Sequence, residues 1–171
     1  MAIEEPVFEN EFEGNEQDVP PFKVFVAGGR SALAREVVEF VEKELDIETV
    51  SLKEPGLGEV TELESLDEAT EECCFALVVL TAESELNGAH GAAAARENAI
   101  HEIGFLQGLY GPNNVLVLRQ EGVAEFAHIS GIEYETFSGN DVKATFERVE
   151  DELSAARDEY EHDCDDDCDH G

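Results

Sequence analysis

The amino-acid sequence predicts an α/β protein in which five parallel strands form one sheet between two layers of helices. Residues 74–80 form a near-continuous apolar run, which is typical of a central parallel strand buried on both faces. Residues 31–45 carry apolar side chains at helical spacing and acidic side chains on the opposite face. Segments of these two kinds alternate along the chain, which indicates βαβ units with right-handed crossovers.

The amino-terminal half is predicted to contain two strands and two helices. In chain order they are a strand at residues 23–27, a helix at 31–45, a strand at 46–52 and a helix at 60–72. The first strand ends at Gly28, and Ser31 is a suitable helix N-cap because its hydroxyl can accept a hydrogen bond from a free backbone amide. Pro55 and the glycines after it mark the loop before the second helix.

The carboxyl-terminal half is predicted to contain three strands and two helices. In chain order they are a strand at residues 74–80, a helix at 93–109, strands at 114–118 and 133–137, and a helix at 142–156. Gly111 and Pro112 end the first of these helices, and Leu153 is the last inward apolar position of the second. The expected strand order is 2-1-3-4-5, as in flavodoxin-like proteins, where ligands bind at the reversal between the first and third strands.

The charge of the chain restricts the classes of partner. Its 42 acidic and 10 basic residues give a formal net charge of -32, which repels nucleic acid and anionic membrane. A hydrophobic share of 42% is too high for a disordered acidic protein. We interpret the acidity as adaptation to a salt-rich cytoplasm, where molar salt shortens the Debye length to roughly 3 Å. The sequence shows neither a membrane span nor a signal peptide, so we expect a cytoplasmic protein.

Three regions are expected: an acidic disordered arm at residues 1–21, one domain at 22–158 and an acidic Cys/His tail at 159–171. Four residues of the tail could in principle hold zinc tetrahedrally, namely His162, Cys164, Cys168 and His170. The two His-x-Cys arms are tight for one ion and no second half supports them, so we expect no metal site. Cys73 and Cys74 are expected to pack against the core as small hydrophobic residues.

The run from Arg96 to Gly104 reads Arg-Glu-Asn-Ala-Ile-His-Glu-Ile-Gly and is the most informative segment of the chain. Asn98 and Glu102 are four residues apart, so they share one face of the predicted helix. On composition alone, Glu102 reads as a solvated carboxylate of an acidic surface. However, this is the most apolar helix of the chain, and a carboxylate there usually has a partner or a function.

Two loops are expected to border the same crevice as this helix. The first follows the first strand and contains Gly28, Gly29, Arg30 and Ser31, a glycine turn at a helix start that could cradle phosphate. The second follows the third strand and contains Thr81, Glu83 and Ser84. Taken alone, both loops also fit ordinary turn chemistry.

With these segments in this order, residues 22–153 resemble the TIR-like nucleotide-binding domain family, whose best-known members are NAD-cleaving effectors of bacterial cyclic-nucleotide antiphage systems. The family motif is Arg-x-Asn-Val-x-x-Glu-x-Gly. This chain keeps Arg96, Asn98, Glu102 and Gly104 and has Ala99 where the family favours Val. The resemblance implies a TIR-like, three-layer version of the flavodoxin-like fold, with Gly104 permitting close helix–sheet packing.

The resemblance also implies a function, NAD+ glycohydrolase activity in antiphage defence or NAD signalling. Glu102 would be the catalytic residue, and NAD would be the substrate, with no cofactor required. Arg96 and Asn98, together with the two loops, would bind the nucleotide. Activity in this family usually requires a homo-oligomer, and because the chain shows no sensor domain, we expect a separate sensor or activator protein.

Two other functions are compatible with the same fold, because fold alone does not decide function. One is a non-catalytic TIR-fold module that binds a nucleotide or a protein. The other is a flavodoxin-like or response-regulator domain, which is disfavoured because Thr81 stands where a phosphoacceptor domain requires an Asp.

Overall fold

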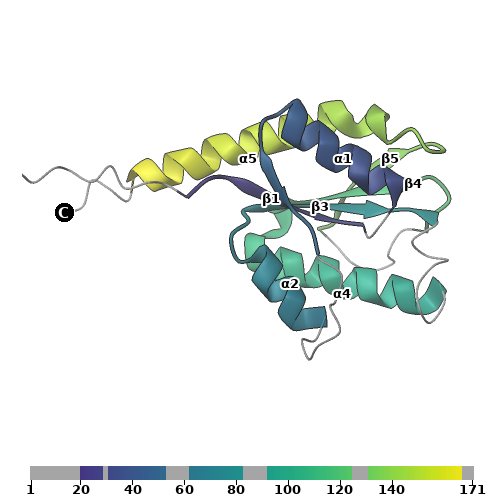
Figure 1. Ribbon diagram of the computed structural model, residues 1–171. Helices are drawn as coiled ribbons and strands as arrows, with labels where there is room; N and C mark the ends of the chain where they lie inside the picture. The colour runs from purple at the N-terminus through teal and green to yellow at the C-terminus, as the bar shows by residue number, and fades with distance from the viewer. Residues whose placement is uncertain (1–19, 29–30, 53–61, 83–91, 125–130, 167–171) are drawn as a thin grey trace, which may run out of the picture.

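The structure, a computed structural model, describes residues 20–28, 31–52, 62–82, 92–124 and 131–166. Its centre is one sheet of five parallel strands in the order β2-β1-β3-β4-β5 (Figure 1). The strands are β1 Lys23–Ala27, β2 Glu48–Val50, β3 Phe75–Leu80, β4 Val115–Gln120 and β5 Glu133–Phe137. The predicted flavodoxin-like topology is therefore confirmed.

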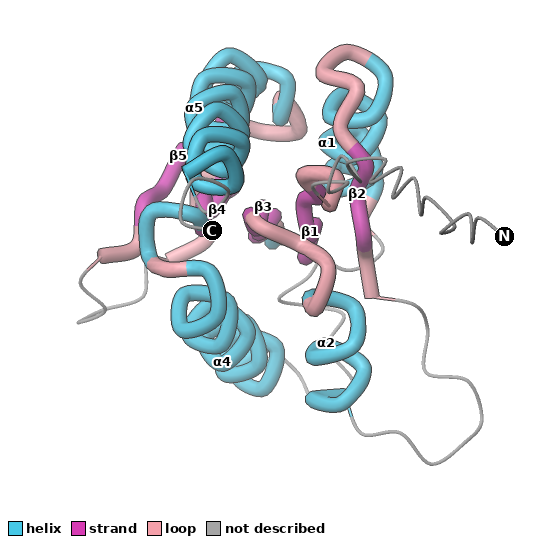
Figure 2. The backbone as a smooth tube through the Cα atoms, turned by 90° about the vertical axis from the view of Figure 1, so that its left-hand side faces the viewer, coloured by secondary structure: helices cyan, strands magenta, loops and turns pink. Residues whose placement is uncertain are grey.

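Helices cover both faces of the sheet (Figures 1 and 2). One face carries α1 and α5, and the other carries α2 and α4. The helices are α1 Ala32–Lys43, α2 Glu62–Thr70, α4 Ala92–Tyr110 and α5 Phe146–Asp166. Short 3-10 turns, η1 Pro112–Asn114 and η2 Val142–Thr145, precede β4 and α5. The result is the three-layer arrangement expected of alternating strands and helices.

The central strand β3 is buried along its whole length, as its continuous apolar run predicts. Alternate side chains point to opposite faces, so Leu77 and Val79 pack under α1 and α5 while Ala76 and Val78 pack under α2 and α4. The free cysteines follow the same pattern, since Cys73 is buried in the second cluster and Cys74 packs against the first. Both therefore abut the core, as expected.

Several element boundaries differ from the sequence prediction, and β2 and α5 are the examples with a visible cause. The strand β2 spans Glu48–Val50 instead of residues 46–52, and Asp46, at φ 54°, turns the chain before the strand begins. The helix α5 continues to Asp166 instead of ending at residue 156 and projects beyond the sheet (Figure 1).

Tyr160 gives a physical reason for the longer α5. Its ring centroid lies 5.8 Å from that of Phe22, and its hydroxyl donates to the carbonyl oxygen of Pro20 at 3.1 Å. Leu153 is therefore not the last inward position of α5. Most of the predicted amino-terminal arm lies outside the described residues, so the three-region division of the chain stays a prediction.

Candidate functional site

Gly28 directly follows β1 at the point where the strand order reverses, and its lack of a side chain is required there. Its φ is +150°, a conformation that L side chains rarely adopt. A Cβ at this position would lie 2.8 Å from Cβ of Val79 and 2.9 Å from the carbonyl oxygen of Val79. Gly28 therefore allows the end of β1 to press against β3. Gly29 and Arg30, which follow it, lie outside the described residues.

Ser31 begins α1 as the predicted N-cap. Its hydroxyl accepts a hydrogen bond from the amide of Ala34 at 3.1 Å, and the residue is buried. The hydroxyl therefore holds the first turn of α1, and the amides of that turn stand beside the carboxyl end of β1. The predicted role of Ser31 in nucleotide binding stays a prediction.

Thr81 and Ala82 follow β3 at the same edge of the sheet. Thr81 is buried, and the amide of Ala82 donates to Oε1 of Gln120 at 2.8 Å. Glu83 and Ser84, the next predicted binding residues, lie outside the described residues.

Glu102 lies on the flank of α4 that faces α2. Leu106 is fully buried against the sheet, and Nε2 of Gln107 donates to the carbonyl oxygen of Gly131, just before β5, at 3.0 Å. At about 100° per residue, Glu102 lies about 40° to one side of Leu106 and Gln107 about 100° to the other side. Because Gln107 marks the β5 side, the half-buried Glu102 faces the side of α2, β1 and the reversal point.

The carboxyl end of α4 shows where Asn98 and Glu102 lie along the direction of the strands. The hydroxyl of Tyr110 donates to the carbonyl oxygen of Thr70 at 2.7 Å, which places the end of α4 beside the amino end of β3. From Tyr110, α4 rises about 12 Å to Glu102 and about 18 Å to Asn98, while β3 spans about 17 Å. The exposed Asn98 is therefore level with the carboxyl edge of the sheet, and Glu102 lies about one turn deeper.

The rest of the motif has a simpler structural account. The side chain of Arg96 lies outside the described part of the chain. Glu97 and His101 are exposed on the outer face of α4, so His101 disturbs no core packing. The prediction that Gly104 permits close helix–sheet packing is wrong, because this residue is exposed and an added Cβ would meet no atom within 4 Å.

The sequence interpretation missed two polar residues at the end of β4. Nη1 of Arg119 donates to the carbonyl oxygen of Val123 at 2.6 Å, and its guanidinium carbon lies 5.7 Å from the ring centroid of Tyr134. Gln120 joins three strand ends through its side-chain amide. The available signal was the switch from the apolar run of residues 115–118 to two long polar side chains.

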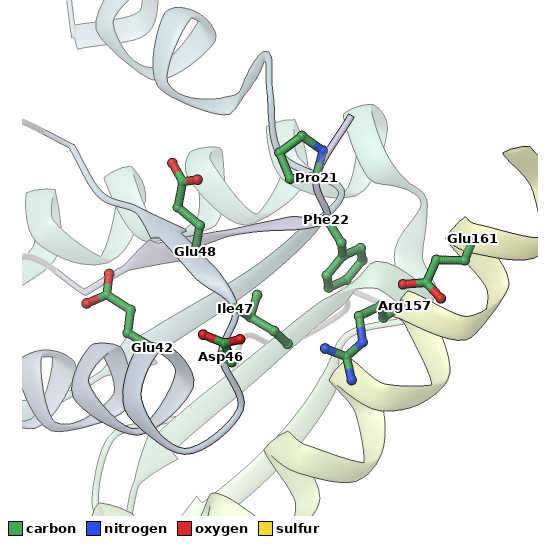
Figure 3. Close-up of a pocket in the computed structure, with 8 residues that line it drawn as sticks. All are labelled: Pro21, Phe22, Glu42, Asp46, Ile47, Glu48, Arg157 and Glu161. Atoms are coloured by element: carbon green, nitrogen blue, oxygen red, sulfur yellow. The ribbon is translucent and has the colours of Figure 1, made fainter. Parts of the chain in front are cut away.

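The opposite, amino edge of the sheet carries a separate hollow of about 440 Å3 between β2, α1 and α5 (Figure 3). Its lining residues are Pro21, Phe22, Glu42, Asp46, Ile47, Glu48, Arg157 and Glu161. They lie beside the amino ends of β1 and β2 and on α1 and α5, so this hollow is distinct from the predicted nucleotide-binding edge.

Ionisable groups with shifted pKa values also lie at the amino edge. Nζ of Lys23 contacts carboxylates of Glu48 at 3.2 Å and Glu72 at 2.8 Å. These contacts raise the pKa of Lys23 and lower that of Glu72. Burial raises the pKa of the Cys73 thiol to about 11 and also raises the pKa of Tyr110.

Among the described residues, no three His, Cys, Asp or Glu side chains are grouped to hold a metal ion. His162 is exposed on α5, and the side chains of Cys164, Cys168 and His170 are outside the described set, so the tail stays untested as a zinc site. Over the described helices, none is long and apolar enough to span a membrane.

Comparison with known proteins agrees with the fold. The chain is 27% identical over 115 residues to the "Uncharacterized protein YuaY" of Escherichia coli (strain K12). The match covers 66% of this chain and 38% of YuaY, so the chain spans well under half the length of that relative. Residues 23–139, from the start of β1 to two residues past β5, match the family model described as "CAP12/Pycsar effector protein, TIR domain". The chain therefore belongs to the family of CAP12/Pycsar effector TIR domains.

Proposed function

We propose that this domain is an NAD+ glycohydrolase that acts in antiphage defence, with Glu102 as its catalytic carboxylate. The observation that carries the proposal is the position of Glu102. It is half-buried on the flank of α4 that faces the reversal between β1 and β3, where sheets of this topology bind ligands. The match to a family of effector TIR domains supports the same assignment.

The reaction is suited to a single carboxylate. When the bond between C1′ of the ribose and the nicotinamide nitrogen breaks, the electron pair leaves with the nicotinamide, which becomes neutral. No general acid is therefore needed, unlike in glycosidases that must protonate an oxygen leaving group. The ribose becomes an oxocarbenium-like cation, and a carboxylate beside it stabilises the growing positive charge. Water then adds to C1′ and loses a proton, which gives nicotinamide, ADP-ribose and H+.

Partial burial strengthens this interaction. A charge pair that is shielded from water interacts more strongly than an exposed one, because the local dielectric constant is lower. Glu102 is shielded along one side by α4 and the sheet, whereas Glu97 of the same helix is exposed on the opposite face. Of these two carboxylates, we therefore assign the action on a ligand in the crevice to Glu102.

The remaining predicted residues are assigned to binding. Asn98 lies level with the carboxyl edge, and the first turn of α1 presents backbone amides there, which is a favourable environment for phosphate. Arg96 and Arg30 are proposed to neutralise the phosphates, because a guanidinium pairs well with phosphate and the chain has only 10 cationic residues against 42 acidic ones. Gly29, Thr81, Glu83 and Ser84 are proposed to complete the rim.

Assembly is part of the proposal. The relative YuaY is far longer than the matched segment, so a domain of this kind also occurs within a larger chain. We propose that the active form is a homo-oligomer and that a separate sensor protein responding to a cyclic nucleotide promotes it. Molar salt should favour such assembly, because it screens the repulsion between copies that each carry -32.

The test compares two charge-removing variants of one helix. Glu102→Gln keeps the size and hydrogen bonding of the side chain but removes its charge, and Glu97→Gln removes the same charge from the outer face. Nicotinamide release from NAD is measured at high protein concentration in molar KCl. We expect wild type and Glu97→Gln to be active at similar rates and Glu102→Gln to be slower by about 100-fold or more.

Thermal unfolding of the same proteins separates catalysis from folding. Glu102→Gln is expected to melt close to wild type. A fall of about 10 °C would make Glu102 a structural anion instead of a catalytic one, because removing one partner of a buried pair costs about 3–5 kcal/mol. Equal rates for active wild type and Glu102→Gln would refute the catalytic role and favour the alternative, a non-catalytic TIR-fold module.

A further inference from the structure

Gln120 joins the carboxyl ends of three strands through one side-chain amide. Its Oε1 accepts from the amide of Ala82, two residues after β3, at 2.8 Å. Its Nε2 donates to the carbonyl oxygen of Gly139, two residues after β5, at 2.7 Å, and approaches Oδ1 of Asn140 at 3.3 Å. Gln120 itself is the last residue of β4, so the amide spans β3, β4 and β5 at one edge of the sheet.

A primary amide suits this pattern of bonds. The side chain must accept from a backbone N–H on one side and donate to a backbone carbonyl on the other, and the amide of Gln carries both groups at the end of one long side chain. Glu would keep the acceptor but lose the donor, and Lys would lose the acceptor. The amide of Ala82 lies past the end of β3, where the strand ladder no longer supplies its partner, so Gln120 replaces that partner.

The neighbouring Arg119 makes the corresponding connection on the opposite face. Its Nη1 bonds the carbonyl of Val123 at 2.6 Å, and its Nη2 bonds Oγ1 of Thr136 at 3.2 Å. Successive residues of a strand point to opposite faces, so the pair ties the end of β4 to its surroundings above and below the sheet. The Ala82 bond of Gln120 is the connection that reaches β3, the strand beside the reversal point.

We infer that Gln120 is a positioning residue of the nucleotide-binding edge, and the inference rests on the proposed function. Its amide holds the peptide between Thr81 and Ala82 in one orientation where the chain leaves β3. The same residue fixes the start of the connection from β5, because it bonds Gly139. Holding both strand exits before the ligand arrives reduces the ordering cost of binding. Gln120 lies on the face of Leu118 and α1, whereas Glu102 lies on the α4 face, so Gln120 acts on binding and not on bond cleavage.

Three variants test the inference. Gln120→Leu removes both hydrogen bonds at similar volume, and Gln120→Glu keeps the acceptor for Ala82. The matched control is Gln107→Leu, which removes another glutamine amide that bonds a loop carbonyl, that of Gly131 at 3.0 Å. Hydrogen exchange is measured at the Ala82 amide, and KM and kcat are measured for NAD cleavage in molar KCl.

We expect the Ala82 amide to exchange about fivefold faster or more in Gln120→Leu, to be partly protected in Gln120→Glu and to be unchanged in Gln107→Leu. KM for NAD should rise several-fold in Gln120→Leu, less in Gln120→Glu, and kcat should change little in either. A purely structural role would lower the melting temperature without this ranking of KM values.

Two results would overturn the inference. One is an Ala82 amide that exchanges equally in wild type and both Gln120 variants. The other is faster exchange with a KM no different from that of Gln107→Leu. If wild type without the proposed sensor protein cleaves no NAD, the Ala82 exchange rates decide by themselves whether Gln120 fixes this edge, and the proposed function is judged separately with the sensor protein added. Should Gln120→Leu not fold, Gln120→Glu carries the same comparison.

Discussion

Gly28→Ala tests the packing at the reversal point most directly. The new Cβ would lie 2.8 Å from Cβ of Val79, 2.9 Å from its carbonyl oxygen and 3.2 Å from Cβ of Ala34. These atoms belong to the buried strand β3 and the first turn of α1, so they cannot move without shifting the core. The variant must also hold φ +150° with a side chain present.

The expected cost combines these two effects. Holding a non-glycine residue in an unfavourable backbone conformation costs about 1–3 kcal/mol. Forcing an extra methyl group into a packed interior costs about 1–3 kcal/mol as well. The variant should therefore lose about 2–6 kcal/mol of unfolding free energy. For a chain of this length, the midpoint of that range lowers the melting temperature by about 10 °C.

Two further glycine variants separate the backbone strain from the steric overlap. Thermal unfolding of wild type and all three variants is followed by far-UV circular dichroism in molar KCl. Gly122→Ala meets open space at φ +94°, so it reports backbone strain alone and should lose less. Gly104→Ala lies in an exposed helical position with open space, and it should gain up to about 1 kcal/mol from helix propensity. If Gly28→Ala melts no lower than Gly122→Ala, the close approach of β1 and β3 does not restrict position 28 to glycine.

Four other outcomes follow from the structure. Because the pKa of Glu72 is lowered in the folded protein by Lys23, its contribution to stability is present above the ordinary value of 4.5 and is lost as pH falls below it. Lys23→Met should therefore reduce the fall in melting temperature as the pH drops below 4.5. An equally steep fall in the variant and in wild type would contradict the pairing of Lys23 with Glu72. The thiol of Cys73, with its pKa raised to about 11, should resist iodoacetamide at pH 8 until the protein unfolds, and peptide mass spectrometry that finds rapid native labelling would refute its burial. Tyr160→Ala should destabilise the fold by about 1–3 kcal/mol, whereas deletion of residues 161–171 should not lower the melting temperature by several degrees. Removing salt should lower the melting temperature, because the charge of -32 then repels itself unscreened, and identical melts at low salt and in molar KCl would exclude this explanation of the acidity.

Much of the candidate site could be placed from the sequence, because its position depends on strand order. Parallel strands joined by helices leave few topologies, and the order 2-1-3-4-5 puts the ends of β1 and β3 side by side. The motif helix comes after β3 in the chain, so its start is expected at the same edge. Helical spacing then puts Asn98 and Glu102 on one flank of α4.

The errors arose where long-range contacts override local pattern. Nothing near Tyr160 in the sequence shows that Pro20 and Phe22 will lie beside it, so the end of α5 was predicted too early. Gly104 suggested close packing, but whether a glycine is covered depends on what lies opposite, and here it faces open space. Gln120 was missed because the partners of its amide, Ala82 and Gly139, come from two other strand exits.

The sequence by itself determined the number of strands, their order, the layers of the sheet and the helix that carries the motif. These follow from periodicity, apolar runs and turn residues, which act within about a dozen neighbouring residues. The tertiary structure alone decided how far Glu102 is buried, which glycine must lack a side chain and which amide fixes the strand ends. Each of these depends on distances between segments far apart in the chain, and such distances are set only when the layers pack.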